Sequence, residues 1–126
     1  MTKSMLEKFD DDPSMVNYQQ ICTETQIYPR EHAVFYPALG LAGEAGEVAN
    51  KVKKIIRDQN ANLKNLSGEV KDEIASELGD CLWYISALAT DLGIGLDGVA
   101  IENVKKLQKR KEQGTIHGSG DKRENG

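Results

Sequence analysis

The chain has 126 residues, enough for one domain with its own hydrophobic core. Its 20 acidic and 16 basic side chains make it mildly acidic, so the composition gives no sign of a nucleic-acid-binding surface. No window approaches the roughly 18 apolar residues of a membrane span, and residues 1–15 lack the apolar segment of a signal peptide. Cys22 and Cys81 lie in helical apolar patterns without a short paired spacing. We therefore expect a single reduced domain, residues 1–126, in the cytoplasm, with no membrane or nucleic-acid partner.

The first half of the chain predicts two helices. The first spans about residues 13–26, because Asp12 is a favoured N-cap and Pro13 suits the first helical position. A Tyr-Pro pair ends it, and residues 30–36 are expected to form a loop. Another proline can open the second helix, which the apolar pattern carries over residues 37–58.

The second half predicts two more helices and a tail. A third helix spans about residues 69–92 and ends at Gly93, and a fourth runs over about residues 97–113. No run alternates with the period of two that a strand requires. The predicted fold is therefore all-α, a four-helix bundle with a helical core over residues 13–112 and a flexible, glycine-rich tail over residues 113–126.

Two pairs of acidic residues lie within the apolar helical runs. Glu44 and Glu47 are three residues apart in the second predicted helix. Glu77 and Asp80 repeat that spacing in the third. At about 100° per residue, each pair lies along the edge of its apolar stripe rather than on the opposite face. Packing of the two stripes is therefore expected to bring the four carboxylates together.

Four apposed carboxylates repel one another unless a cation lies between them, which favours a metal site. The ordinary alternative is a solvated face with local helical pairing. All four ligands are hard oxygens, which suit Mg²⁺, with Mn²⁺ as a substitute, better than Zn²⁺. The Glu-x-x-His of di-iron bundles is absent from both helices. Mg²⁺ held in this way leaves coordination positions for substrate phosphates.

Cationic and polar side chains on the same or neighbouring ridges indicate phosphate binding. They are Lys51, Lys54, Asn103, Lys106 and Arg110. Each lysine taken singly is better explained as a surface residue paired with a nearby acid. Together they would form a cationic wall beside the metal, suited to a polyphosphate.

Three segments, "YPALGLAGEAGEVANKVKK", "ELGDCLWYISALATDLGI" and "KRKEQGTIHGSGDKR", resemble the MazG-like nucleotide pyrophosphohydrolases, an all-α family. The resemblance runs over about residues 18–123. It implies cleavage of a nucleoside triphosphate to the monophosphate and pyrophosphate. It also implies that Mg²⁺ is bound by Glu44, Glu47, Glu77 and Asp80. The family pattern begins Glu-Glu-x-x-Glu, whereas Gly43 stands at the first position here.

In that reaction water attacks the α-phosphorus in line while pyrophosphate leaves. Glu47 is favoured to orient or deprotonate the water, because it lies centrally on its ridge. Lys54, Lys106 and Arg110 are expected to hold the leaving pyrophosphate. Tyr84 lies one turn beyond the last carboxylate and is expected to pack against the sugar or base, with an edge-of-core tyrosine as the open alternative.

The chain is expected to form a homo-oligomer. Trp83 lies off the main stripe of its helix and has no evident partner within the chain, which suggests a subunit contact. The family resemblance also implies dimers or tetramers.

The tail places His117, Lys122 and Arg123 around a Gly-Ser-Gly-Asp segment. Such a segment can wrap a polyanion with charge and backbone N–H groups. We expect it to order over bound nucleotide, and a tail without a role is the alternative.

Two other functions stay open from the sequence. The same carboxylate cage could serve a hydrolase of guanosine polyphosphate alarmones, which would differ in its base pocket. In either enzyme, residues 28–37 and the first helix are expected to line that pocket, with Tyr18 and Gln19 as candidates. Alternatively, the chain could be a non-catalytic helical association module whose acids bind a structural metal.

Overall fold

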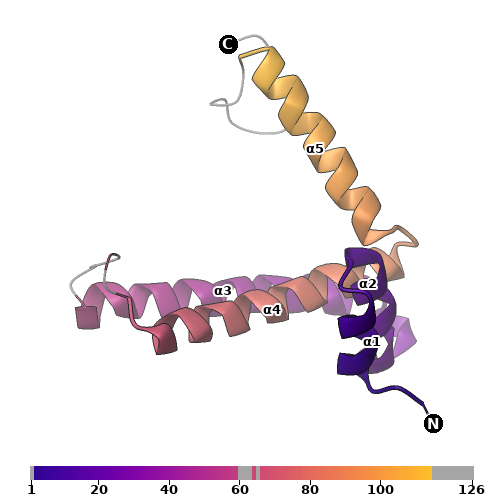
Figure 1. The fold of residues 1–126 in the computed structure, drawn as a ribbon, viewed down its shortest axis with the longest axis horizontal. Coiled ribbons are helices and arrows are strands. Elements are labelled where there is room, and N and C mark those ends of the chain that lie inside the picture. The colour runs from indigo at the N-terminus through magenta and orange to yellow at the C-terminus, as the bar shows by residue number, and fades with distance from the viewer. Residues whose placement is uncertain (1, 60–63, 65, 115–126) are drawn as a thin grey trace.

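The computed structural model describes residues 2–59, 64 and 66–114, and that part of the chain contains helices and no strand (Figure 1). The elements in chain order are α1 (Met5–Asp11), α2 (Met15–Cys22), η1 (Thr23–Thr25), η2 (Arg30–His32), α3 (Phe35–Gln59), α4 (Gly68–Asp91) and α5 (Leu96–Glu112). The four predicted helices correspond to α2 with the 3₁₀ turn η1, α3, α4 and α5. The predicted all-α fold is confirmed.

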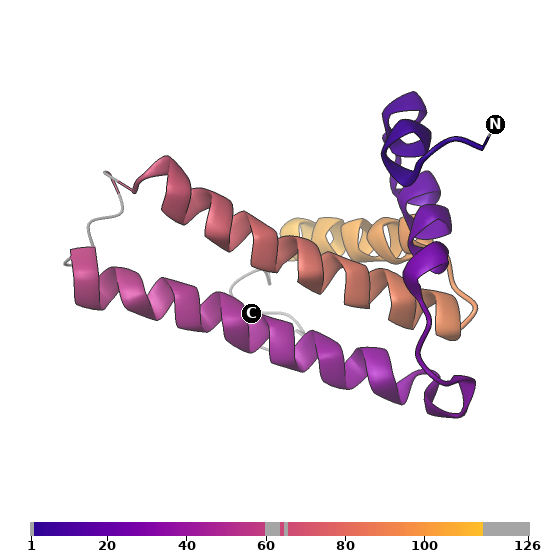
Figure 2. The same cartoon turned by 90° about the horizontal axis from the view of Figure 1, so that it is seen from below.

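α3 and α4 form a long antiparallel hairpin and lie side by side in both views (Figures 1 and 2). Their facing apolar stripes bury Ile55 of α3, while Ala87 and Ala89 of α4 are buried toward the other end. The side chain of Ser67 caps α4 by accepting the N–H of Val70 at 3.2 Å. α3 begins two residues before its predicted start, with the proline in the first turn, where a backbone N–H is not needed.

The N-terminal segment differs most from the prediction. The helix expected from residue 13 begins at Met15, because the hydroxyl of Ser14 caps it by accepting the N–H of Asn17 at 3.1 Å. α1 was not predicted, although Ser4 followed three residues later by Glu7 is a capping signal. α2 packs against α4 and supplies Ile21 and Cys22 to the core.

Hydrogen bonds from α2 anchor α5 at its base. Gly93 ends the preceding helix in a left-handed conformation with φ 72°. The amide nitrogen of Gln19 donates to the hydroxyl of Thr90 at 3.1 Å and to the carbonyl of Ile94 at 2.9 Å. Its amide oxygen accepts the N–H of Leu96 at 2.7 Å. From this base α5 projects away from the hairpin (Figure 1).

The expectation that Trp83 has no partner within the chain is wrong. Its indole N–H donates to the hydroxyl of Thr25 at 2.8 Å, and its ring makes an edge contact with Tyr84 at 5.1 Å between centroids. Thr25 lies in η1, a 3₁₀ turn that helical periodicity cannot align with α4. Trp83 therefore joins the N-terminal segment to the hairpin.

Within residues 2–59, 64 and 66–114, no helix is by itself long and apolar enough to cross a membrane. α4 and α5 meet the length and hydropathy test only as a pair, and that pair is bent by 101° at its break. The predicted tail from residue 115 onward, with His117, Lys122 and Arg123, lies outside the described residues.

Candidate metal centre

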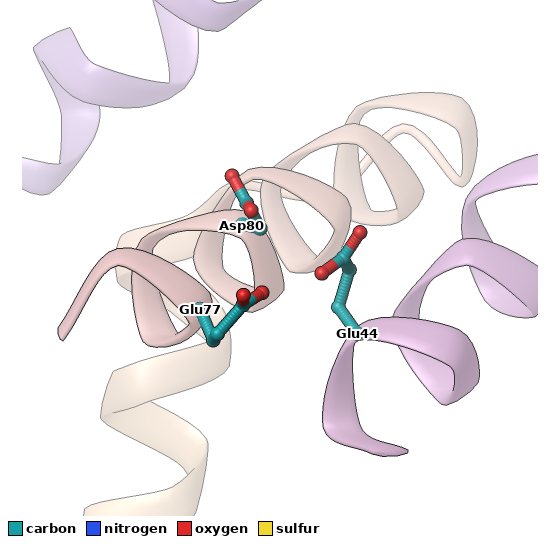
Figure 3. A group of neighbouring side chains, drawn as sticks. All are labelled: Glu44, Glu77 and Asp80. Carbon is teal, nitrogen blue, oxygen red and sulfur yellow. The ribbon is translucent and has the colours of Figure 1, made fainter. Parts of the chain in front are cut away.

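Three of the four predicted metal ligands meet between α3 and α4. One carboxylate oxygen from each of Glu44, Glu77 and Asp80 lies within 4.8 Å of the others (Figure 3). Glu77 and Asp80 are three residues apart and therefore share a face of α4. Glu44 reaches them from the facing side of α3 (Figure 3). The ridge geometry expected from the sequence is realised for these three residues.

The cluster holds negative charge in a partly buried place. Burial, together with the nearness of Glu77, Asp80 and Glu47, raises the pKa of the Glu44 carboxyl above its ordinary value. A divalent cation would relieve this repulsion. The three donors are hard oxygens and leave room in an octahedral shell for water and phosphate oxygens. The residues therefore fit Mg²⁺ or Mn²⁺.

Glu47, the fourth predicted ligand, is not part of this group of oxygens. Its side chain is exposed one turn further along α3. Its charge is nevertheless close enough to contribute to the raised pKa of Glu44. Glu47 therefore lies beside the cluster, where it can act on a water molecule or complete the coordination.

The two predicted cations of α3, Lys51 and Lys54, lie one and two turns beyond Glu47 along the helix. Lys51 is one turn beyond Glu47 and pairs across the hairpin with Glu73, with 3.9 Å between nitrogen and oxygen. Lys54 lies a further turn on, and its charge helps to lower the pKa of Asp58, after the larger effect of the hydrogen bonds from Arg57. Lys51 is thus the cation of α3 closer to the carboxylates.

The predicted phosphate-binding residues of α5 lie elsewhere in the single chain. Asn103 and Lys106 line an open, mainly apolar groove together with Met15 and Leu82. None of the clustered carboxylates lines this groove. Arg110 lies one turn beyond Lys106, further from the base of α5.

Tyr84 belongs to an aromatic cluster next to the carboxylates. Its ring lies 6.4 Å from that of Tyr36, which stacks on Tyr28 at 4.6 Å between centroids. The ring also lies directly against Gly40 of α3, where a β-carbon would collide with it. Tyr28 and Tyr36 belong to residues 28–37, where the sequence predicts part of the base pocket, although neither tyrosine was singled out by that prediction.

The comparison with protein families matches residues 37–115 to the MazG nucleotide pyrophosphohydrolase domain. The matched segment contains all three clustered carboxylates, Glu47 and the polar residues of α5. It thus includes the predicted metal ligands and the predicted substrate-binding residues of α3, α4 and α5, whereas His117, Lys122 and Arg123 of the predicted tail follow it in the sequence.

Two curated proteins are similar in sequence to this chain. The "Gene 37 protein" of Mycobacterium phage L5 is 44% identical over 112 residues, covering 84% of this chain and 96% of the relative. The "Uncharacterized protein YvdC" of Bacillus subtilis (strain 168) is 34% identical over 84 residues, covering 65% of this chain and 79% of the relative. No solved structure matches the chain significantly. The family match over more than half of its residues shows that the chain belongs to the MazG nucleotide pyrophosphohydrolase family.

Proposed function

We propose that the chain is a Mg²⁺-dependent pyrophosphohydrolase that converts a nucleoside or deoxynucleoside triphosphate to the monophosphate and pyrophosphate. The main observation in favour of this proposal is that carboxylate oxygens of Glu44, Glu77 and Asp80 lie within 4.8 Å of one another, in a chain that belongs to this family. Control of the nucleotide pool, including removal of non-standard nucleotides, is the role that such a reaction suits.

The roles of the acidic residues follow from the reaction. Glu44, Glu77 and Asp80 would hold Mg²⁺, with Mn²⁺ as a substitute. When bound, the ion offsets phosphate charge and lowers the pKa of a coordinated water. Glu47 lies outside the three-oxygen group and would accept a proton from the attacking water. The water oxygen bonds to the α-phosphorus as the bond to the bridging oxygen breaks, and pyrophosphate carries away the bonding electrons.

The cations would serve the leaving group. Lys51 is held by Glu73 near the carboxylates, and Lys54 continues the same ridge. Asn103, Lys106 and Arg110 lie on α5 and would reach phosphates at a carboxylate cluster if α5 packs against the hairpin of a second copy.

A homo-oligomer, dimer or tetramer, is therefore part of the proposal. Ile101, Val104 and Leu107 of α5 follow one another at intervals of three residues and have between 42% and 59% of their surface exposed, which makes an apolar row along this helix. Light scattering should show at least a dimer at micromolar concentration, and Leu107→Asp should reduce the mass. Leu6→Asp on α1, also an exposed leucine, is the matched control. A monomeric wild type would overturn this part.

A cytoplasmic location accords with both cysteines, Cys22 and Cys81, being free thiols.

The decisive assay incubates the protein with each standard deoxynucleoside triphosphate in Mg²⁺ and measures pyrophosphate. We expect pyrophosphate and monophosphate in equal amounts and no reaction with EDTA. Turnover of guanosine polyphosphates alone, with pyrophosphate leaving the 3′ position, would favour an alarmone hydrolase. Absence of turnover with any nucleotide would instead favour a non-catalytic association module.

A further inference from the structure

Three tyrosines from distant parts of the chain form a continuous aromatic wall, Tyr28–Tyr36–Tyr84. Tyr28 and Tyr36 are stacked, with 14° between their planes and 4.6 Å between centroids, and Tyr84 continues the row at 6.4 Å. Tyr28 is 7% exposed, whereas Tyr36 is 44% exposed. The wall therefore has a buried end and an open middle that can receive a flat ligand.

The wall adjoins the carboxylate cluster. Tyr84 is one turn beyond Asp80 on α4, and its ring lies against Gly40, one turn before Glu44 on α3. One turn of helix is about 5.4 Å. Burial, the neighbouring tyrosine and the charges of both carboxylates all raise the pKa of the Tyr84 hydroxyl, which accords with this proximity.

The buried carboxylate of Asp91 holds the segment that carries the wall. It accepts the hydroxyl of Tyr28 at 2.6 Å, the backbone N–H of Val34 at 3.0 Å and the guanidinium of Arg30 at 3.0 Å. The side chain of Asp91 is 0% exposed. The guanidinium of Arg30 also covers the Tyr28 ring at 4.4 Å. One side chain from the end of α4 thus fixes the loop just before α3.

Val34 shows that this arrangement is imposed on the backbone. Its φ is 72°, a left-handed conformation that a β-branched residue adopts only under strain. The hydrogen bond from its N–H to Asp91 holds it there, two residues before Tyr36. Backbone strain kept by a buried carboxylate is typical of a segment whose geometry matters for function.

We propose that Tyr36 and Tyr84 bind the base of the nucleotide by stacking, and that Asp91 is the positioning residue that sets this wall. The inference rests on the proposed function, because a nucleotide whose phosphates lie at the carboxylates would extend its base toward a neighbouring surface. Every nucleobase has a face that can stack on an aromatic ring. The wall contributes affinity for the nucleoside part and none for the phosphates.

The test measures the contribution of the base to binding separately from that of the phosphates. Titration calorimetry in Mg²⁺ measures the affinity of the full-length protein for α,β-imido analogues of the four standard deoxynucleoside triphosphates, and for inorganic tripolyphosphate. Tyr36→Leu should weaken binding of the best analogue by about 10-fold and leave tripolyphosphate binding unchanged. Tyr36→Phe keeps the ring and should bind like the wild type.

Asp91→Asn should weaken analogue binding and again spare tripolyphosphate. Asp72→Asn makes the same change on an exposed residue of α4 and should have no effect. Adding Val34→Gly to Asp91→Asn should restore part of the affinity, because glycine adopts the left-handed conformation without strain. The tyrosine variants test the wall even if the Asp91 variant fails to fold.

The outcomes separate the two proposals. If the wild type cleaves nucleotides and Tyr36→Leu binds the analogue as tightly as the wild type does, this inference is overturned and the proposed function stands. Equal weakening of analogue and tripolyphosphate also overturns it, because the wall then acts on the phosphates or the whole fold. A wild type that neither binds nor cleaves any nucleotide overturns the proposed function and this inference together.

Discussion

The α3–α4 hairpin and α5 carry the two halves of the predicted site, and the chain holds them in different ways. In the hairpin, acids on facing helices meet within 4.8 Å, and a tyrosine from α4 lies directly on a glycine of α3. α5 is fixed at its base by Gln19 and leaves an apolar row exposed. The proposed metal and base sites therefore lie in the part that one chain assembles alone. The proposed role of the α5 cations requires a second copy of the chain.

The largest expected effect is on the carboxylates. Glu77→Gln should lower turnover by at least about 100-fold, beyond the loss expected for a group that only supports a ligand. Glu44→Gln, Asp80→Asn and Glu47→Gln should act alike. In the absence of metal, the melting temperature should hold or rise, because removal of one charge relieves the repulsion that raises the pKa of Glu44. Activity and thermal melting measure the two effects.

Glu69→Gln is the matched control for this series. Glu69 is exposed two turns before Glu77 on α4 and is not part of the three-oxygen group. This variant should keep most of the activity. Near-wild-type turnover in Glu77→Gln would place the reaction elsewhere in the molecule.

A second prediction concerns stability and pH at Asp91. Burial alone raises the pKa of this carboxyl, but the hydrogen bonds from Tyr28, Val34 and Arg30 outweigh it and hold the pKa below its ordinary value. Its stabilisation is therefore complete above the unfolded-state pKa of about 3.9 and is lost as pH falls through the lower folded-state pKa. At pH 7, Asp91→Asn should cost about 2 kcal/mol, since an amide N–H₂ would face other donors.

Denaturant unfolding at a series of pH values checks this prediction. The free-energy difference between wild type and Asp91→Asn should be constant from pH 7 to about 5 and should narrow below about 3.9. A difference that is independent of pH down to the acid transition would show that the charge of Asp91 contributes nothing.

The α3–α4 hairpin was predictable because both of its helices have the regular α-helical repeat of about 3.6 residues per turn. Positions three and four residues apart on a helix share a face whatever surrounds the helix. The meeting of Glu44 with Glu77 and Asp80 could therefore be predicted from the sequence. α4 itself follows the predicted bounds to within a residue, because Ser67 and Gly93 mark its ends.

The aromatic wall and the partner of Trp83 were not predictable in this way. Asp91 lies at the end of α4, but its three donors come from residues 28–34, and Val34 is in a left-handed conformation. Loop and 3₁₀ segments have no period that would place their side chains against a helix. Likewise, nothing in the pattern of α5 shows that its apolar row would be left uncovered by the rest of the chain.

A third prediction tests how closely the two helices of the hairpin approach. Gly40→Ala should destabilise the protein by about 1 to 2 kcal/mol, since overpacking against the Tyr84 ring outweighs the gain in helix propensity. Gly46→Ala on the same helix meets nothing within 4 Å and should stabilise it by about 0.5–1 kcal/mol. Urea unfolding of both variants measures the difference. Equal effects would mean that Tyr84 does not lie against α3.

The smallest expected effect concerns the tail that follows α5. Gly114 follows α5 in a left-handed conformation with φ 67°. In the sequence, the predicted tail continues from the end of α5 that carries Arg110. The sequence prediction is that this tail orders over bound nucleotide and shields the reacting phosphate from bulk water. A chain ending at Gly114 should then fold and bind metal as before. Its KM for the nucleotide should rise by about threefold, the loss expected for one hydrogen bond. Replacing His117, Lys122 and Arg123 with alanine in the full-length chain should reproduce part of that rise. If both proteins keep the wild-type KM and kcat, the tail has no part in the site, and α5 contributes through its helical residues alone.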